Sequence, residues 1–393
     1  MNPQSIRRQF VKLSLVALLA SAALGSAWAE EITVKLGFTG PLSGGAALYG
    51  KNAASGIEMA IKEINAAGLE VAGKKVKLEL EALDDKYSPA ESVINARRLV
   101  QQSNVPVVFC PHSGGIYAMQ AINEQEKFII MGYSSAPQIT ESGNKLTIRI
   151  PPHFDSYVQP FITYEMKKFG KRVGLLPGDH EYGKSWTQLF EPAWKASGGT
   201  VVSNNPMSYS KSADFYTGVS RVLAEKPDVV FIGGPSEPTG LIVKQARELG
   251  FKGGFVVMDQ AKLDEMAKIT GGFEALEGSV GVLPVSYDDR VGTQTFSANY
   301  RKLYGADHAP TAEAAYNYAM THVLSNAMKL AGTTSDAAAI RAKMNEAVSK
   351  LTEGQNAGHF GGIDAKGGSE IEPVVAVIEG GKLKPVPLSD LLK

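Results

Sequence analysis

The sequence predicts an α/β protein of two lobes, each built around a parallel sheet. Strand and helix patterns alternate along most of the chain, which favours parallel strands joined by crossover helices. The chain has 393 residues, more than a single hydrophobic core usually serves. The alternation also restarts after Pro151-Pro152, because two prolines bar a helix and interrupt a sheet.

The residues before Pro151 predict the first sheet. Apolar residues alternate over 32–38, as in a strand, and recur with helical spacing over 57–64. Ser88-Pro89-Ala90-Glu91 predicts a helix start with a capping box and proline in the first turn. Further strands are expected over 75–83, 105–110 and 128–133, and a further helix over 115–127.

The residues after Pro152 predict a second sheet of the same architecture. Strands are expected over 172–176, 200–203, 229–232 and 254–258, and helices over 157–169, 184–196, 215–225 and 240–249. Beyond Pro284, helices over 293–304, 312–330 and 336–350 precede short strands over 374–378 and 383–386. A helical block without strands of its own must pack on an existing sheet, so we expect lobes that are discontinuous in sequence.

The N-terminal residues 1–29 are typical of a secretory signal peptide. Arg7, Arg8 and Lys12 form a cationic start, an apolar run covers 13–24, and Ala27-Trp28-Ala29 predicts cleavage after Ala29. The run is well short of the roughly 20 residues that span a bilayer. Arg7-Arg8 also resembles a twin-arginine signal, so both export routes stay open. We expect a soluble protein of the periplasm.

Charge and cysteine content exclude some classes of binding partner and a disulfide within the chain. The chain carries 40 basic and 40 acidic residues, and cleavage would leave 37 basic residues, so electrostatics predicts no binding to nucleic acid or anionic membrane. Cys110 is the only cysteine, which excludes a disulfide within the chain. We expect no cofactor, and a monomer, because no heptad repeat is present.

One Gly-rich stretch comes close to a phosphate-binding loop. Residues 45–52 read GAALYGKN, but Asn52 stands where that loop needs a hydroxyl residue for magnesium. An exported protein also meets no nucleotide pool. The stretch, which includes Tyr49, is better interpreted as a strand-to-helix turn near a small-molecule site.

Several stretches together carry a family resemblance. They are 32–52, Leu83-Asp84-Asp85, 137–140, 179–183, Asp214-Phe215 and 227–234. In this order, over nearly the whole mature chain, they resemble the periplasmic binding proteins for branched-chain amino acids. The resemblance implies the type I periplasmic-binding fold, in which two Rossmann-like lobes are joined by three crossings and hold the ligand between them.

The same resemblance implies the lobe boundaries and the partner. Residues 30–150 plus 285–359 would form the N-terminal lobe, and 151–284 plus 360–393 the C-terminal lobe, with crossings near Ile150, Pro284 and Phe360. The partner it implies is the inner-membrane permease of an ABC importer.

In the first lobe, two strand ends offer ligand-binding groups. Ligands of parallel sheets lie beyond the carboxyl ends of strands, where helix N-termini present free amides. Ser113 follows one predicted strand, and Tyr133-Ser134-Ser135 follows another. The resemblance implies that Ser113 and Ser135 hold a ligand carboxylate together with the backbone at Tyr133. Helix capping is the ordinary alternative for a serine.

In the second lobe, the resemblance implies that Tyr182 lines the cleft and that Asp259 pairs with the ligand amino group. Gln260 is one residue away and stays an alternative, although an amide there would weaken the case for a charged amine. An aspartate after a strand is also a common turn or cap residue.

The predicted side-chain pocket departs from the family pattern. An aromatic pocket position falls on Glu313, with Tyr316 a turn away, and 235–238 (PSEP) lacks an expected tyrosine. Tyr87 stands where some members have a half-cystine. Tyr49, Tyr133 and Tyr182 still predict an aromatic-walled site. A polar amino acid, an amide or urea-like solute, an aromatic acid and leucine therefore remain open as ligands.

An exported enzyme and a ligand sensor are the two other function classes that concern this sequence. The histidines show no zinc-binding spacing, no Gly-x-Ser-x-Gly motif is present, and Cys110 ends a buried strand, so an exported enzyme is disfavoured. His112 and Ser113 are adjacent residues, which diverge at a strand end and seldom align for proton transfer. A sensor that reports its ligand to a receptor would share the fold and stays an alternative.

Overall fold

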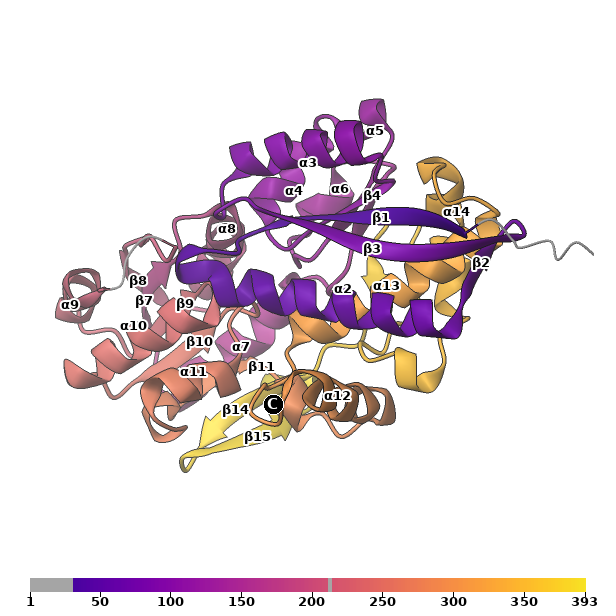
Figure 1. The fold of residues 1–393 in the computed structure, drawn as a ribbon. Helices are drawn as coiled ribbons and strands as arrows, with labels where there is room; N and C mark the ends of the chain where they lie inside the picture. The colour runs from indigo at the N-terminus through magenta and orange to yellow at the C-terminus, as the bar shows by residue number, and fades with distance from the viewer. Residues whose placement is uncertain (1–30, 211–213) are drawn as a thin grey trace, which may run out of the picture.

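The structure is a computed structural model that describes residues 31–210 and 214–393. The predicted signal peptide, its arginine pair and its cleavage site lie outside the described residues. Within these residues, two large sheets with helices on both faces form two lobes (Figure 1). No helix in this part of the chain is long and apolar enough to cross a membrane.

The first sheet is parallel except for its edge hairpin. Its strand order is β2 (Leu69–Val71), β3 (Lys74–Asp84), β1 (Glu31–Gly40), β4 (Val107–Cys110), β5 (Ile129–Gly132) and β6 (Thr147–Arg149). The pair β2 and β3 is antiparallel, and the other neighbours are parallel. The carboxyl ends of β4 and β5 therefore lie side by side, which brings the predicted serine loops together.

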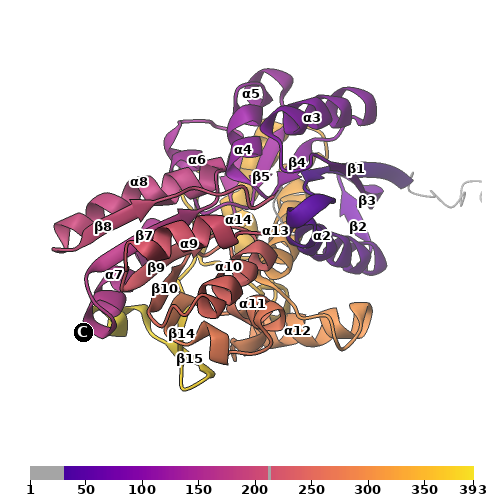
Figure 2. The same ribbon diagram turned by 90° about the vertical axis from the view of Figure 1, so that its left-hand side faces the viewer.

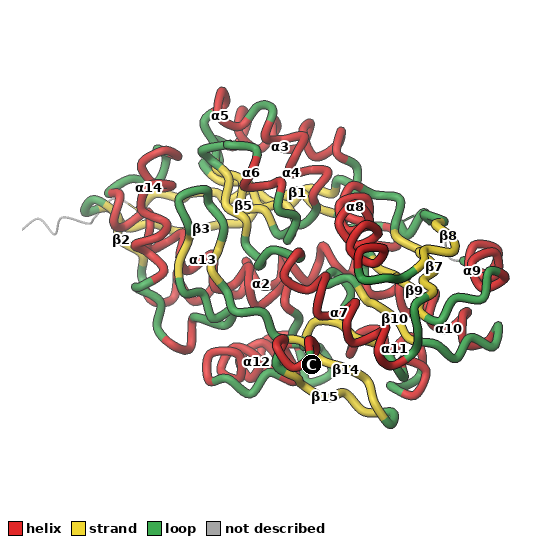
Figure 3. Tube along the Cα trace, turned by 180° about the vertical axis from the view of Figure 1, so that it is seen from behind, coloured by secondary structure: helices red, strands yellow, loops and turns green. Residues whose placement is uncertain are grey.

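Helices cover both faces of this sheet. On one face lie α2 (Ala47–Ala67), which follows the short helix η1 (Gly44–Ala46), α13 (Ala312–Ala331) and α14 (Ala337–Val348) (Figures 1 and 3). On the other lie α3 (Pro89–Ser103) and α4 (Ser113–Gln120). Leu36 and Phe38 of β1 share one core with Ala319 of α13, so the C-terminal helical block packs on the first sheet as expected.

The second sheet is parallel at its centre and antiparallel at one edge. Its order is β15 (Lys382–Val386), β14 (Val375–Glu379), β11 (Ser279–Val282), β10 (Gly254–Val257), β9 (Val229–Gly233), β7 (Arg172–Pro177) and β8 (Thr200–Asn204). Its helices are α7 (Asp155–Lys168), α8 (Glu181–Ala196), α9 (Tyr216–Ala224), α10 (Ser236–Glu248) and α11 (Leu263–Thr270).

Strand β9 shows why the central strands read as continuous apolar runs. Val229 and Phe231 pack in the core that holds α7 and α8, and Val230 and Ile232 pack in the core that holds α9 and α10 (Figure 2). Side chains alternate across a strand, so a sheet covered on both faces needs apolar residues at every position.

Some local predictions were wrong. The helix expected over 115–127 ends at Gln120, and a separate α5 (Asn123–Glu126) follows. Buried Asn123 donates hydrogen bonds to the carbonyls of Phe128 and Leu146, which hold the chain in this second helix. At the start of α3, Ser88 accepts from the amide of Glu91, but only this half of the capping box forms. Strands β6 and β11 and helix α11 had no sequence prediction.

Within residues 31–210 and 214–393, the chain passes between the sheets three times. It leaves the first sheet after β6, and α12 (Val291–Tyr304) follows β11 on the way back. The last passage lies between β13 (Ser369–Glu370) and β14, later than expected, because Phe360 and Ile363 pack in the first core. The exact lobe boundaries stay a prediction.

Candidate functional site

A small cavity lies between the two lobes, at the strand ends. Its volume is about 20 Å³, which is room for about one water molecule. All of the predicted site residues except Glu313 line it. The lining residues are Tyr49, Tyr87, Pro111, His112, Ser113, Tyr133, Ser134, Ser135, Pro151, Tyr182, Asp259 and Gln260.

Asp259 links the lobes at the centre of the cavity. It directly follows β10 and accepts hydrogen bonds from Ser135 of the first lobe, from Tyr182, and from Trp186 Nε1 at 3.0 Å. Ser135 Oγ also lies 2.5 Å from Tyr182 Oη. Burial, and next the charge of Asp259, raise the pKa of Tyr182 well above its usual value, so its hydroxyl stays a neutral donor. These polar contacts hold the lobes together around the cavity.

The first-lobe loop is capped by histidine and not by serine. His112 is the N-cap of α4, and its Nδ1 accepts from the amide of Gly115 at 3.1 Å. Ser113 is therefore free of the capping role, and its hydroxyl lies 2.6 Å from that of Ser134. Two buried hydroxyls from neighbouring strand ends thus meet at the cavity, next to a helix N-terminus that favours an anion.

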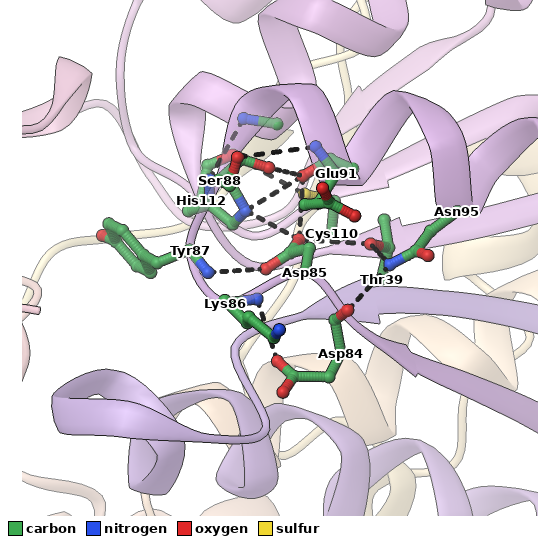
Figure 4. A network of polar contacts seen from close by, with 12 residues as sticks. Thr39, Asp84, Asp85, Lys86, Tyr87, Ser88, Glu91, Asn95, Cys110 and His112 are labelled. Atoms are coloured by element: carbon green, nitrogen blue, oxygen red, sulfur yellow. Dashed lines mark hydrogen bonds and ion pairs between the residues drawn. The ribbon is translucent and has the colours of Figure 1, made fainter.

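A buried polar network behind this loop was missed by the sequence analysis (Figure 4). Asp85 Oδ2 accepts from Thr39 Oγ1 at 3.1 Å, from Ser92 Oγ at 2.8 Å and from His112 Nε2 at 2.9 Å. Asp85 Oδ1 accepts from the amide of Tyr87, whose ring stacks on His112 with centroids 4.7 Å apart. The network fixes the positions of Tyr87 and His112 in the cavity wall.

Residues of this network also have side chains of the kinds that bind metal ions. Asp85, Cys110 and His112 are buried, and their possible ligand atoms lie within 4.8 Å of one another. Both oxygens of Asp85 and both nitrogens of His112 already have hydrogen-bond partners. A metal ion would have to replace these bonds, so we interpret the cluster as structural support for the loop.

Gln260 brings an unpaired polar group to the cavity. It is 5% exposed, and its Nε2 donates to Tyr87 Oη at 2.8 Å. Its Oε1 is buried without a hydrogen-bond partner among the described residues. Both Asp259 and Gln260 therefore line the cavity, but only Gln260 leaves a side-chain acceptor unused.

Glu313 lies behind the cavity wall. It is fully buried in the first turn of α13, and its Oε1 is 3.1 Å from Lys262 Nζ, which is 2% exposed. Lys262 Nζ also donates to the carbonyls of Asp259 at 2.8 Å and Gln260 at 2.9 Å. The ion pair therefore joins α13, which packs on the first sheet, to the loop after β10. A direct contact of Glu313 with ligand stays a prediction.

A hydrogen bond between Asn52 and Glu265 also crosses the lobes. Glu265 accepts from Asn52 Nδ2 at 2.9 Å and from Ser236 Oγ at 2.5 Å. Asn52, the residue that departs from the phosphate-loop pattern, thus contacts the second lobe. Burial, and next the charge of Glu313, raise the pKa of Glu265 from 4.5 to about 7.

A larger cavity of about 330 Å³ adjoins the first. The two share Tyr87, His112, Ser113 and Tyr182 in their walls. The larger one continues between the lobes past Lys86. Space for a solute therefore exists beside the serine loop even with Ser135 and Asp259 in contact.

Comparison with known proteins identifies the family. The pattern that defines the periplasmic binding proteins matches residues 33–369. The chain belongs to the periplasmic binding protein family. The Leu/Ile/Val-binding protein BraC3 of Rhizobium johnstonii is 28% identical over 351 residues, covering 87% of this chain and 92% of that protein. The Leu/Ile/Val-binding protein of Escherichia coli is 28% identical over 279 residues, covering 70% and 74%.

Solved structures agree with this membership. A leucine-binding protein of Thermotoga maritima has a TM-score of 0.75 and 25% identity, over 90% of this chain and 97% of that one. A solute-binding protein of R. palustris in complex with benzoate has a TM-score of 0.76 at 18% identity, over 91% and 96%, which shows the fold alone. The predicted family and the type I fold of two parallel-sheet lobes are confirmed.

Proposed function

We propose that the protein binds a small amino acid or related solute between its lobes in the periplasm and delivers it to the permease of an ABC importer. One observation carries the proposal most directly. Ser135 of the first lobe meets Tyr182 and Asp259 of the second at a shared cavity. A ligand placed there would contact both lobes at once, which favours the closed arrangement over an open one.

The polar groups suit the two ends of an amino acid. The hydroxyls of Ser113 and Ser135, with the N-terminus of α4, would hold a carboxylate. The carboxylate of Asp259 would hold an ammonium group, and a charged pair in a poorly solvated site contributes strongly to discrimination. The names of the relatives, which describe Leu/Ile/Val binding, support this class of ligand. The division into two lobes is part of the same proposal, with 30–150 plus 285–359 in the first lobe and 151–284 in the second as predicted, but with residues 360–370 in the first lobe, because Phe360 and Ile363 pack in its core.

Binding tests this function directly. Protein freed of co-purified solute by refolding is titrated with a panel of amino acids, amides, urea and aromatic acids, and its thermal midpoint is followed. A ligand at 100 times its Kd stabilises the folded state by about 2.7 kcal/mol, which shifts the midpoint measurably. A panel in which no compound shifts the midpoint would contradict the proposal.

A tyrosine variant tests the site itself. Tyr182→Phe keeps the buried ring and removes the hydroxyl that contacts Ser135 and Asp259, so we expect at least tenfold weaker binding with folding intact. Tyr216→Phe is the matched control, because the exposed Tyr216 bonds Glu248 on the surface, outside the cavity walls. Equal affinity in both variants would remove Tyr182 from the site.

A further inference from the structure

The cavity between the lobes has no aliphatic wall. Every residue that lines it carries a hydrogen-bonding side chain, apart from Pro111 and Pro151. Leucine, isoleucine, valine, phenylalanine and methionine are all missing from the lining. An aliphatic ligand side chain closed into this space would separate buried polar groups from water without replacing their hydrogen bonds, which is unfavourable.

Gln260 and Tyr87 form a polar pair in this wall whose hydrogen-bonding capacity is not fully used. Gln260 Oε1 is buried and has no partner among the described residues. Tyr87 Oη accepts a hydrogen bond from Gln260 Nε2 at 2.8 Å. The hydroxyl proton of Tyr87 then has no acceptor among the described residues. If the amide is turned over, the tyrosine donates to Gln260 Oε1 and the amide nitrogen is unpaired instead. In either orientation, the amide of this cavity-lining residue keeps one unpaired polar atom.

The side chains behind this pair keep it in place. The ring of Tyr87 stacks on His112, and its amide donates to Asp85 Oδ1 at 2.9 Å. The backbone carbonyl of Gln260 accepts from Lys262 Nζ at 2.9 Å. A preorganised pair of this kind can distinguish ligands, because it does not adapt to a partner that cannot form hydrogen bonds.

We propose that the ligand is an α-amino acid whose side chain ends in an uncharged carboxamide, and that Gln260 and Tyr87 recognise this carboxamide. The inference rests on the proposed function, because it assumes that the amino acid end binds at the serine loops and Asp259. A carboxamide carries both an N–H donor and a carbonyl acceptor, so it satisfies the pair in either orientation of Gln260.

The charges around the pair favour a neutral side chain over an anionic one. Asp85 lies fully buried beside Tyr87, and buried Glu313 pairs with Lys262, whose ammonium group also contacts the Gln260 carbonyl. The buried cation Lys262 is already held by Glu313 and two backbone carbonyls. Among the described residues, no lysine or arginine lines the small cavity to balance a second ligand carboxylate, and Lys86 lines only the adjoining larger cavity.

Three nearly isosteric amino acids provide the test. Asparagine, leucine and aspartate differ mainly in whether the branched side-chain end is an amide, two methyl groups or a carboxylate. We expect the refolded wild-type protein to bind asparagine at least tenfold more tightly than leucine or aspartate in isothermal titration. Gln260→Met, which keeps the length of the side chain and removes the amide, should lose this preference.

The controls separate the outcomes. Gln159→Leu removes an exposed glutamine of α7 outside the cavity walls and should keep the wild-type preference, and thermal unfolding without ligand checks that each variant folds. Leucine binding as tightly as asparagine would overturn this inference and leave the proposed function standing. A preference for asparagine that survives in Gln260→Met would overturn the role of Gln260. Binding of none of the three would overturn the inference, and the wider panel would then decide whether the proposed function also fails.

Discussion

Replacing Glu313 by glutamine should weaken ligand binding through a residue that does not line the cavity. Glu313 and Lys262 are buried, 3.1 Å apart, and come from elements that pack on different sheets. We therefore expect this pair to form when the lobes close and to be solvated when they open. In Glu313→Gln, closure must bury the ammonium group of Lys262 without its counter-charge.

The size of the effect follows from the contacts that remain. Breaking a buried ion pair by removing one partner costs about 3–5 kcal/mol. Lys262 keeps its hydrogen bonds to the carbonyls of Asp259 and Gln260, so we expect the lower end, about 3 kcal/mol. Since 1.4 kcal/mol is a factor of ten, the Kd should rise on the order of 100-fold.

A double-mutant cycle measures this effect. The Kd of leucine or asparagine, whichever the wild type binds, is determined by calorimetry for Glu313→Gln, Lys262→Met and the double variant. Each single variant should weaken binding strongly, and the double variant should weaken it by much less than the two together, because it buries no unpaired charge. Unchanged affinity in Glu313→Gln, or additive losses in the double variant, would refute the reasoning.

Two further predictions concern the pH dependence of ligand affinity and the role of the serine hydroxyls. The raised pKa of Glu265 means that closure takes up a proton between pH 4.5 and about 7, so affinity should be highest at low pH and fall by up to about tenfold per pH unit across this range. In Glu265→Gln, the pH dependence of the affinity should disappear in ligand titrations at several pH values. A pH dependence that persists in this variant would have to come from another titratable group. The double variant Ser113→Ala, Ser135→Ala should lose roughly 100-fold in affinity with little change in the unfolding midpoint of the ligand-free protein, because a ligand carboxylate would be buried with fewer donors. Undiminished binding by calorimetry would remove the serines from the site.

Strand ends made the location of the site predictable. In a parallel sheet the carboxyl ends of neighbouring strands lie at one edge, so Ser113 after β4 lies close to the serine pair after β5, where its hydroxyl meets that of Ser134 and all three serines line one cavity. The order of the second-lobe strands placed Asp259 at the corresponding edge of the other sheet. The three passages between the sheets then bring the two edges together.

Contacts that depend on distant residues were not predictable in this way. The helix break before Asn123 depends on the carbonyls of Phe128 and Leu146. His112 and not Ser113 caps α4, and Tyr87 joins the cavity wall because Asp85 holds its amide. None of these three features produces a periodic pattern of apolar residues in the sequence.

The sequence by itself determined the alternation of strands and helices, because this follows from local periodicity, and its resemblance to the binding proteins implied the family and most residues at the cavity. Only the tertiary structure decided the pairing of Glu313 with Lys262, of Asn52 with Glu265 and of Gln260 with Tyr87. Each pair joins residues from different lobes, so its partners are set by how the two sheets meet. In a buried interface, the partner of a polar group decides whether that group supports the wall or remains available to the ligand.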